Sequence, residues 1–193
     1  PHEGFVVLYA GAHGIPNQLE TLIEAATQLA SRKDSQHIHI RMVGDGISKP
    51  ALQAMAKERG LTNIQFLPPV PKKDVAQQLA NADACYLQFK DAPLYQWGVS
   101  PNKLFDYLLS GKPTLYAANV KTNPVLSEQA GVALKPGDVD GLVNAILQLA
   151  AMPAEERAAM GARGRAYVLA NHNFSILGKK LADSLKELTN TSS

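Results

Sequence analysis

The sequence predicts an α/β domain in which a mostly parallel β-sheet is flanked by helices on both faces. Two observations predict this class. The first is that short runs rich in apolar and β-branched residues alternate with longer segments. The second is that the apolar residues of the longer segments recur at helical spacing. The chain has 193 residues, of which 46% are hydrophobic, which is enough for one sizeable core. With no strong linker or repeat in view, we expect residues 1–193 to form a single domain.

Six segments are predicted as strands because each is a short apolar run that ends at a glycine, a proline or a polar turn. In chain order they are FVVLYA (5–10), HIHIRMVG (37–44), NIQFL (63–67), ACYLQF (84–89), PTLYA (113–117) and GVALK (131–135).

The segments that follow the strands are predicted as helices, each with one apolar stripe to lay on the sheet. They cover residues 18–30, 50–60, 73–82, 101–110, 124–130 and 141–150. Two further helices, AEERAAMGARGRAYVLAN and FSILGKKLADSLKEL, follow without a strand between them. We therefore expect extra C-terminal helices outside the alternating pattern.

Composition and charge exclude several classes of function. A formal charge of +2 with no long block of like charge argues against a nucleic-acid partner but leaves small anionic ligands open. The apolar runs are far shorter than the roughly 20 residues of a membrane span. The single cysteine, Cys85, can form no internal disulfide, which suits a cytoplasmic protein. His37 and His39 share a strand face, but no third ligand is spaced to join them, so no metal site is predicted.

The unusual residues of the chain gather where strands end. The loops GAHGIPN (11–17), GDGIS (44–48), PPVPKK (68–73) and DAPLYQWGVSPNK (91–103) each follow a predicted strand. In an open parallel sheet, ligands bind beyond the carboxyl ends of the strands, near the point where the strand order reverses. We therefore predict one ligand-binding cleft assembled from these loops.

Two of these loops offer glycines that would let backbone approach a ligand. Gly11 and Gly14 flank His13, which is either a ligand for phosphate or a sugar hydroxyl, or an exposed loop residue without a role. Gly44 and Asp45 form a second such turn, in which Asp45 either contacts ligand or only shapes the turn.

The stretch SPNKLFDYLLSGKP raises a sharper question. Ser100 is predicted as the N-cap and Pro101 as the first helical residue, which places Asn102 and Lys103 in the first turn. A cation there is unfavourable beside the free N–H groups unless an anion lies opposite.

The helical spacing of this stretch suggests what the anion is. The apolar residues Leu104, Phe105, Leu108 and Leu109 are expected to face the sheet, with Lys103 and Asp106 together on the solvent side. A diphosphate against Lys103 and a ribose diol on Asp106 would fit. The alternative is a local Lys103–Asp106 surface ion pair, and only the position at a strand's carboxyl end favours the ligand.

Tyr95 and Trp97 form an apolar pair in the long fourth loop. Such a pair either packs against a missing partner or stacks on a sugar or base.

Taken together in this order, the motifs resemble the carboxy-terminal nucleotide-sugar-binding domain of GT-B glycosyltransferases of family 4, the glycosyl transferases group 1 family. They are YAGAHG followed by LETLIEAA, VGDG, LTNIQFLPPVPKKDV with LANADACYL, SPNKLFDYLLSGKPTLYA, EQAG, and ERAAMGARGRAYV with NFS. The resemblance covers nearly the whole chain.

The resemblance implies a Rossmann-like domain that binds a nucleotide-sugar donor, with an acceptor-binding N-terminal domain absent from this chain. The start at Pro-His-Glu without methionine also indicates a piece of a longer protein. The resemblance further implies retention of anomeric configuration without a metal cofactor. It places Asp106 on the ribose and the backbone of residues 69–73, including Val70, on the base. The final helix would cross back onto the other domain.

The sequence departs from the family pattern at three positions. Gly98 stands where the first of two acids eight residues apart is expected, and Ala12 and Asn17 stand where an arginine and a lysine are expected. Lys103 then becomes the candidate catalytic cation that neutralises the diphosphate.

The SPNKLFDY version resembles the subgroup of bacterial surface-polysaccharide synthesis, including transferases of N-acetylated amino sugars such as N-acetylfucosamine, which favours a UDP-sugar. A lipid-linked acceptor would bring the full protein to the membrane periphery. Two alternatives stay open: a degenerate interaction domain that has lost donor binding, and a GT-B-like sugar-nucleotide 2-epimerase.

Overall fold

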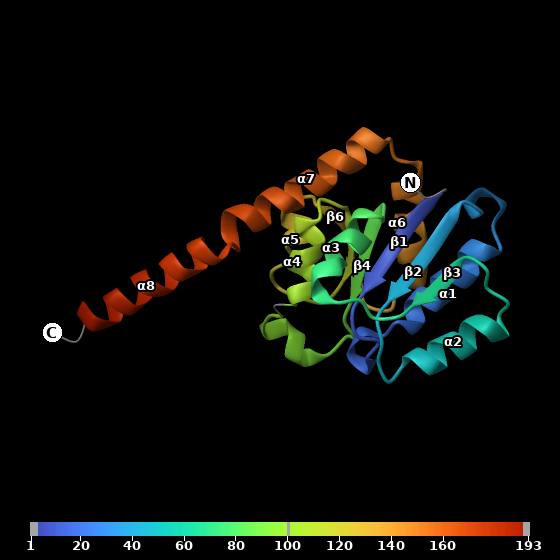
Figure 1. Cartoon of the computed structure of the whole chain (residues 1–193), viewed down its shortest axis with the longest axis horizontal. Helices are drawn as coiled ribbons and strands as arrows, with labels where there is room; N and C mark the ends of the chain where they lie inside the picture. The colour runs from blue at the N-terminus through green and yellow to red at the C-terminus, as the bar shows by residue number, and fades with distance from the viewer. Residues whose placement is uncertain (1–3, 100, 191–193) are drawn as a thin grey trace.

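The computed structural model describes residues 4–99 and 101–190 (Figure 1). Its centre is one six-stranded sheet in which every neighbouring pair is parallel, in the order β3-β2-β1-β4-β5-β6. The strands are β1 (Phe5–Ala10), β2 (Ile38–Val43), β3 (Ile64–Leu67), β4 (Ala84–Gln88), β5 (Thr114–Ala117) and β6 (Gly131–Leu134). The predicted class is confirmed, and each strand lies within one residue of its predicted bounds.

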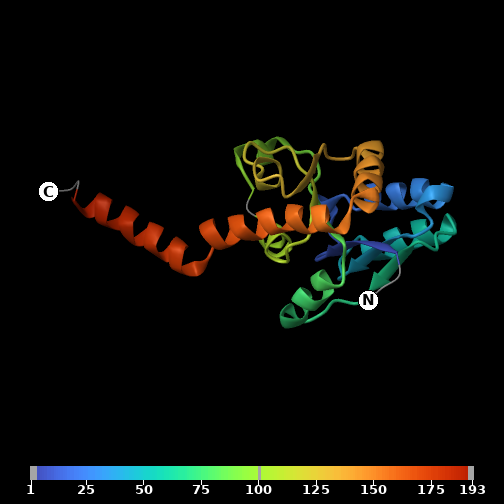
Figure 2. The same ribbon diagram turned by 90° about the horizontal axis from the view of Figure 1, so that it is seen from above.

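Helices cover both faces of the sheet, as Figure 2 shows from above. One face carries α1 (Glu20–Ala30), α2 (Lys49–Glu58) and α6 (Val139–Ala151), and the other carries α3 (Lys72–Ala80), α4 (Asn102–Leu109), α5 (Pro124–Ser127) and α7 (Ala154–Asn171). Three short 3-10 helices were not predicted: η1 (Ile15–Asn17), η2 (Lys33–Ser35) and η3 (Pro93–Trp97). Each is short and lies inside a loop, where apolar periodicity gives no signal.

Two apolar cores hold the layers together. The alternating residues of β1 divide between them: Val7 and Tyr9 face α1 and α6, whereas Val6 and Leu8 face α3 and α4. All four side chains are fully buried. A parallel strand covered on both faces must be apolar throughout, which is why FVVLYA shows no alternation with polar residues.

Helix α7 lies directly on α4 through a face of small residues. Gly161 and Gly164 are both buried, and a Cβ added at Gly161 would lie 1.8 Å from the carbonyl oxygen of Gly111, just beyond α4. The absence of side chains here is what lets the two helices approach.

Helix α8 (Phe174–Asn190) leaves the domain and projects away from it (Figures 1 and 2). Its apolar residues recur on one face and are exposed: Phe174, Leu177, Leu181, Leu185 and Leu188. At the break before it, the ring of His172 stacks on Phe105 of α4, with centroids 4.3 Å apart. The ring nitrogen Nε2 of His172 also lies 3.1 Å from the Tyr167 hydroxyl. The predicted C-terminal helices are confirmed. In the described ranges no helix is both long and apolar enough to cross a bilayer.

Candidate functional site

A cleft of about 410 Å³ opens at the carboxyl ends of β1, β2 and β3, on one side of the point between β1 and β4 where the strand order reverses. The loops after β1, β2 and β3 and the first turns of α4 all contribute to it. It is lined by Ala10, Gly11, Ala12, Val43, Gly44, Asp45, Pro69, Val70, Lys72, Val75, Lys103 and Asp106. Of the predicted site residues, the structure therefore brings together Gly11, Gly44, Asp45, Val70, Lys103 and Asp106.

The loops after β1 and β2 form a backbone platform beneath the cleft. The Gly11 N–H donates to Val43 O at 2.9 Å, and the His13 N–H donates to Asp45 O at 2.8 Å. Gly44 has φ of 137°, and a Cβ there would lie 2.0 Å from the carbonyl oxygen of Gly11. Only glycine fits this position, because both the dihedral angle and the close approach of the two loops exclude a side chain.

Helix α4 is fixed to the end of β1 by Tyr107. Its hydroxyl accepts from the Ala10 N–H at 2.8 Å and donates to the Ala10 carbonyl at 2.9 Å. Tyr107 is buried, whereas Leu109, which was expected to face the sheet, is 38% exposed. The expected inward position of Leu109 was therefore wrong. Tyr107 faces the sheet instead, because the backbone of Ala10 satisfies its hydroxyl and so allows a tyrosine to be buried.

The start of α4 also differs by one residue from the prediction. Pro101, with ψ of 121°, is the N-cap, so Asn102 is the first helical residue, and no side chain of the described residues is seen to cap the helix. Ser100, the predicted cap, lies outside the described residues. Asn102 and Lys103 still occupy the first turn, but Asn102 is exposed and does not line the cleft.

Lys103 and Asp106 both line the cleft, as their shared side of α4 predicted, but Lys103 is only partly exposed. Its aliphatic chain lies over Gly11, where a Cβ would meet Cδ, Cε and Nζ at 2.7 to 2.8 Å. Its ammonium donates to the Tyr9 hydroxyl at 2.9 Å and to Asn17 Oδ1 at 3.4 Å. In the described part of the chain Lys103 forms no ion pair with Asp106. Burial lowers the pKa of Lys103 from 10.5 to about 8.

The two acids of the cleft differ in their surroundings. The Asp106 side chain is exposed at the rim. The Asp45 carboxylate accepts the Gly46 N–H at 2.8 Å, as a turn-forming aspartate does, while it also lines the cleft.

His13 departs most from expectation, because it is neither exposed nor part of the cleft lining. Its ring is fully buried, between the rings of Tyr9 and Phe66 at centroid distances of 5.6 and 6.4 Å. Burial, with a further contribution from Lys49, lowers its pKa to about 4, so the ring is neutral near pH 7. Gly14 precedes η1 and also lies outside the lining, since a 3-10 turn separates this loop from α1.

Residue types alone did not single out Tyr9, Lys49 and Lys72. Tyr9 lies in the apolar run of β1 like an ordinary strand residue, but its hydroxyl contacts the Lys103 ammonium. Lys49 donates to the carbonyls of Gly44 and Leu67, at 2.6 and 2.9 Å, and so ties together the ends of β2 and β3. Lys72 supplies a second lysine to the lining. No sequence signal distinguishes these lysines from surface ones.

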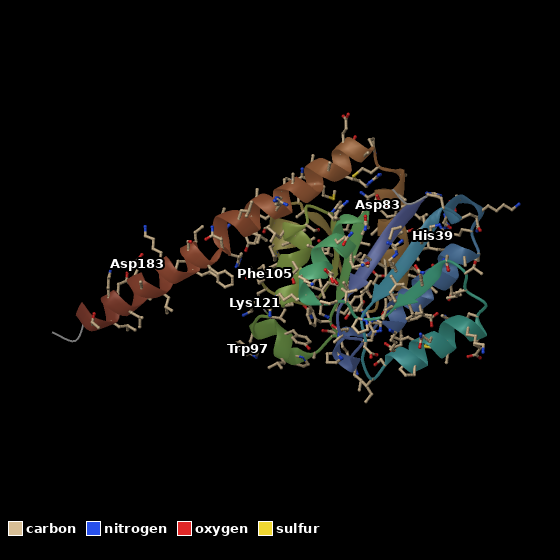
Figure 3. All side chains as sticks on the ribbon, viewed as in Figure 1. His39, Asp83, Trp97, Phe105, Lys121 and Asp183 are labelled. Atoms are coloured by element: carbon tan, nitrogen blue, oxygen red, sulfur yellow. The ribbon has the colours of Figure 1, made fainter. Side chains whose placement is uncertain are left out.

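The aromatic pair of the fourth loop separates into two environments. Tyr95 packs on Phe89 with centroids 5.4 Å apart. Trp97 is 78% exposed, and the ammonium of Lys121 lies 5.4 Å from its ring centroid. Figure 3 shows Trp97 and Lys121 near each other at the edge of the domain.

Known proteins resemble this chain over most of its length. Residues 4–152 match the family described as glycosyl transferases group 1. WcaI of Escherichia coli, named as a glycosyl transferase of colanic acid biosynthesis, is 30% identical over 157 residues, 79% of this chain and 37% of the relative. A GDP-mannose-dependent monoacylated alpha-(1-6)-phosphatidylinositol monomannoside mannosyltransferase of Corynebacterium glutamicum is 29% identical over 170 residues, 86% of this chain and 43% of the relative.

Solved structures share the fold. Sucrose-phosphate synthase of Thermosynechococcus elongatus superposes with a TM-score of 0.82 at 20% identity, over 99% of this chain and 47% of that one. Anabaena HepE in complex with UDP superposes with a TM-score of 0.78 at 18% identity, over 96% of this chain and 49% of that one.

The chain thus spans less than half of each of these relatives. The family match covers every strand and every loop of the cleft. This chain belongs to the glycosyl transferases group 1 family.

Proposed function

We propose that this chain is the donor-binding domain of a retaining glycosyltransferase that uses a UDP-sugar. The observation that carries the proposal is the placement of Lys103 in the cleft at the strand-order reversal, with only neutral oxygens as its hydrogen-bond acceptors in the described residues. A half-buried ammonium without a counter-charge favours an anionic ligand. UDP as the nucleotide is supported by the fold shared with HepE, which was solved with UDP.

The lining residues suggest a role for each part of the donor. Lys103 and the free N–H groups of the Asn102–Lys103 turn would hold the diphosphate, and the Asp106 carboxylate would accept hydrogen bonds from the ribose diol. Backbone near Val70 would contact the base. Gly11 leaves room for the Lys103 side chain, and Gly44 lets the two loops approach each other.

In the transfer step, the bond between the sugar C1 and the diphosphate oxygen breaks, and its electron pair stays on the diphosphate. A new bond forms between C1 and the acceptor hydroxyl oxygen, and the hydroxyl proton passes to the departing diphosphate oxygen. Lys103 would stabilise the charge that develops on the departing diphosphate, so the step requires no metal.

We place this reaction in a larger cytoplasmic protein acting in bacterial polysaccharide or lipopolysaccharide synthesis. An N-terminal domain would supply the acceptor site, and a lipid-linked acceptor would draw the protein to the membrane surface. The sugar we expect is a hexose or an N-acetylated amino sugar. By itself the present chain would bind nucleotide and turn over nothing.

The test is a calorimetric titration of the chain with UDP, GDP and ADP, with chelator in place of metal. We expect UDP to bind, and Lys103→Ala to weaken binding by about 1–3 kcal/mol, roughly five- to 150-fold, as for a charge-assisted hydrogen bond. Asp106→Asn should weaken UDP binding while leaving inorganic diphosphate binding unchanged, because it acts on the ribose. Preference for GDP would overturn the choice of base.

One observation favours a different function, that of an interaction domain without donor binding. The carboxylate expected at position 98 is absent, and Leu94 and Trp97 of the same loop are 72% and 78% exposed. If folded protein binds no nucleotide at millimolar concentration, this second function gains support. Product analysis with the full-length protein would separate transfer from 2-epimerisation.

A further inference from the structure

The Lys103 ammonium reaches its position by crossing from α4 to the end of β1. It lies 2.9 Å from the Tyr9 hydroxyl, 3.4 Å from Asn17 Oδ1, and 4.9 Å from the centroid of the Tyr9 ring. Gly11 lies beneath the lysine chain and has no side chain to obstruct it. Its contacts with the Tyr9 hydroxyl, the Tyr9 ring and Asn17 Oδ1 all lie on one side of the ammonium. The position of the ammonium is therefore set by β1 and the loop that follows it.

Both acceptors are themselves held by a single backbone carbonyl. The Tyr9 hydroxyl donates to Ala12 O at 2.5 Å, which leaves its oxygen lone pairs for Lys103. Asn17 Nδ2 donates to the same carbonyl at 2.9 Å, which turns Oδ1 toward the lysine. Because Tyr9 is fully buried and Asn17 nearly so, neither side chain has another place to go.

An ammonium group has three N–H donors, and within the described ranges Tyr9 and Asn17 occupy two of them. The third is left for the cleft that Lys103 lines. Both acceptors are neutral, so they orient the charge without cancelling it. A carboxylate in either position would have paired with Lys103 and competed with an anionic ligand.

The sequence positions give this geometry a meaning. Ala12 and Asn17 occupy the places where relatives are expected to carry cations, and the lysine from α4 now touches the residue at one of those places. In this chain the cation near the first loop comes from α4, and Asn17 of that loop accepts a hydrogen bond from it.

We infer that Tyr9, assisted by Asn17, is a positioning residue that holds the Lys103 ammonium charged and directed into the donor cleft. The inference rests on the proposed function, because the cleft is the donor site only if that function is right. Burial lowers the pKa of Lys103 to about 8, and hydrogen bonds that the ammonium donates act in the opposite direction, because they favour the charged form.

The groups that face Lys103 come from several elements. The neutral ring of His13 lies behind Tyr9 on the loop after β1, and Asp45, Lys72 and Asp106 line the same cleft. Any of them can add to the pH dependence of binding, so the Lys103→Ala variant, which lacks the ammonium, provides the baseline.

The experiment has two independent readouts on wild type and Tyr9→Phe. The first is the titration of the Lys103 Cε resonance by NMR without ligand. The second is UDP affinity between pH 7 and 9, where the phosphates, whose second pKa is about 6, stay ionised. Losing the acceptor removes a hydrogen bond from the charged form, so the Lys103 midpoint should move to lower pH. UDP affinity at pH 7.5 should fall about fivefold to tenfold, as for one hydrogen bond.

Two further variants sharpen the result. In the double variant Tyr9→Phe, Lys103→Ala, the tyrosine change should have no further effect, because Tyr9 acts through the lysine. Tyr86→Phe is the matched control: it also removes a buried hydroxyl from the sheet, one bonded to Gln88 at 2.8 Å, and should leave UDP affinity unchanged. If Tyr9→Phe unfolds the chain, Asn17→Ala takes its place with the same expected directions and smaller changes.

The outcomes are distinguishable. If wild type binds no UDP, the proposed function fails, and the Lys103 titration still decides whether Tyr9 positions the ammonium. If wild type binds and Tyr9→Phe leaves the Lys103 midpoint and the pH profile in place, Tyr9 is only structural and the inference is overturned.

Discussion

Replacing Gly161 with alanine should separate helix α7 from α4. The added Cβ would lie 1.8 Å from the Gly111 carbonyl oxygen and 2.4 Å from its carbon, and backbone cannot rotate away as a side chain can. Overpacking costs about 1–3 kcal/mol, and we take the upper end because the opposing atoms are backbone. Alanine returns about 1 kcal/mol of helix propensity, so the free energy of unfolding should fall by about 2 kcal/mol.

The measurement is thermal unfolding followed by circular dichroism. For a chain of this size, about 2 kcal/mol corresponds to a fall in Tm of about 4–8 °C. Gly178→Ala in α8 is the matched control, since a Cβ added there would meet no described atom within 4 Å apart from its own turn of helix, and it should not lower Tm. If Gly161→Ala melts at or above the wild-type temperature, the close approach of α7 to α4 is wrong.

Two further predictions concern buried titratable groups. The pKa of Lys103 is lowered from 10.5 to about 8 in the folded state, so unfolded chains bind more protons between those values and stability rises with pH across that window. Lys103→Met should therefore raise Tm at pH 7.5 while weakening UDP binding, and the gain in Tm should shrink as the pH approaches 10.5; an unchanged gain would contradict the lowered pKa. Burial raises the pKa of the Cys85 thiol to about 12, so a thiol-specific reagent at pH 8 should label Cys85 only after denaturation, and rapid labelling of folded protein would show that β4 is accessible.

The fold could be predicted because each of its elements carries a local signal. Strands buried on both faces must be continuous apolar runs, as FVVLYA and ACYLQF are, and their alternation with amphipathic helices leaves a parallel sheet as the natural arrangement. The register and the pairing of β1 with β4 come from packing that no local pattern encodes.

The candidate site was predictable in its location and less so in its geometry. The reversal of strand order places Gly11, Gly44 and Lys103 in one cleft, as their positions after strands suggested. The direction of Lys103 was not predictable, because helical spacing takes no account of the space that Gly11 leaves on another element. His13 was misjudged for a similar reason: nothing local shows that Tyr9 and Phe66 enclose a loop residue.

The stacking of His172 on Phe105 joins the chain just before the last helix to α4. Helix α8 has 17 residues and is therefore about 25 Å long, and it begins two residues after His172, whose ring contacts Phe105 of α4. A rotation of about 10° at His172 would carry the far end about 4 Å. A partner that binds the exposed leucines of α8 would act on the segment that follows the His172–Phe105 contact. That contact reaches α4, the helix that carries Lys103 and Asp106.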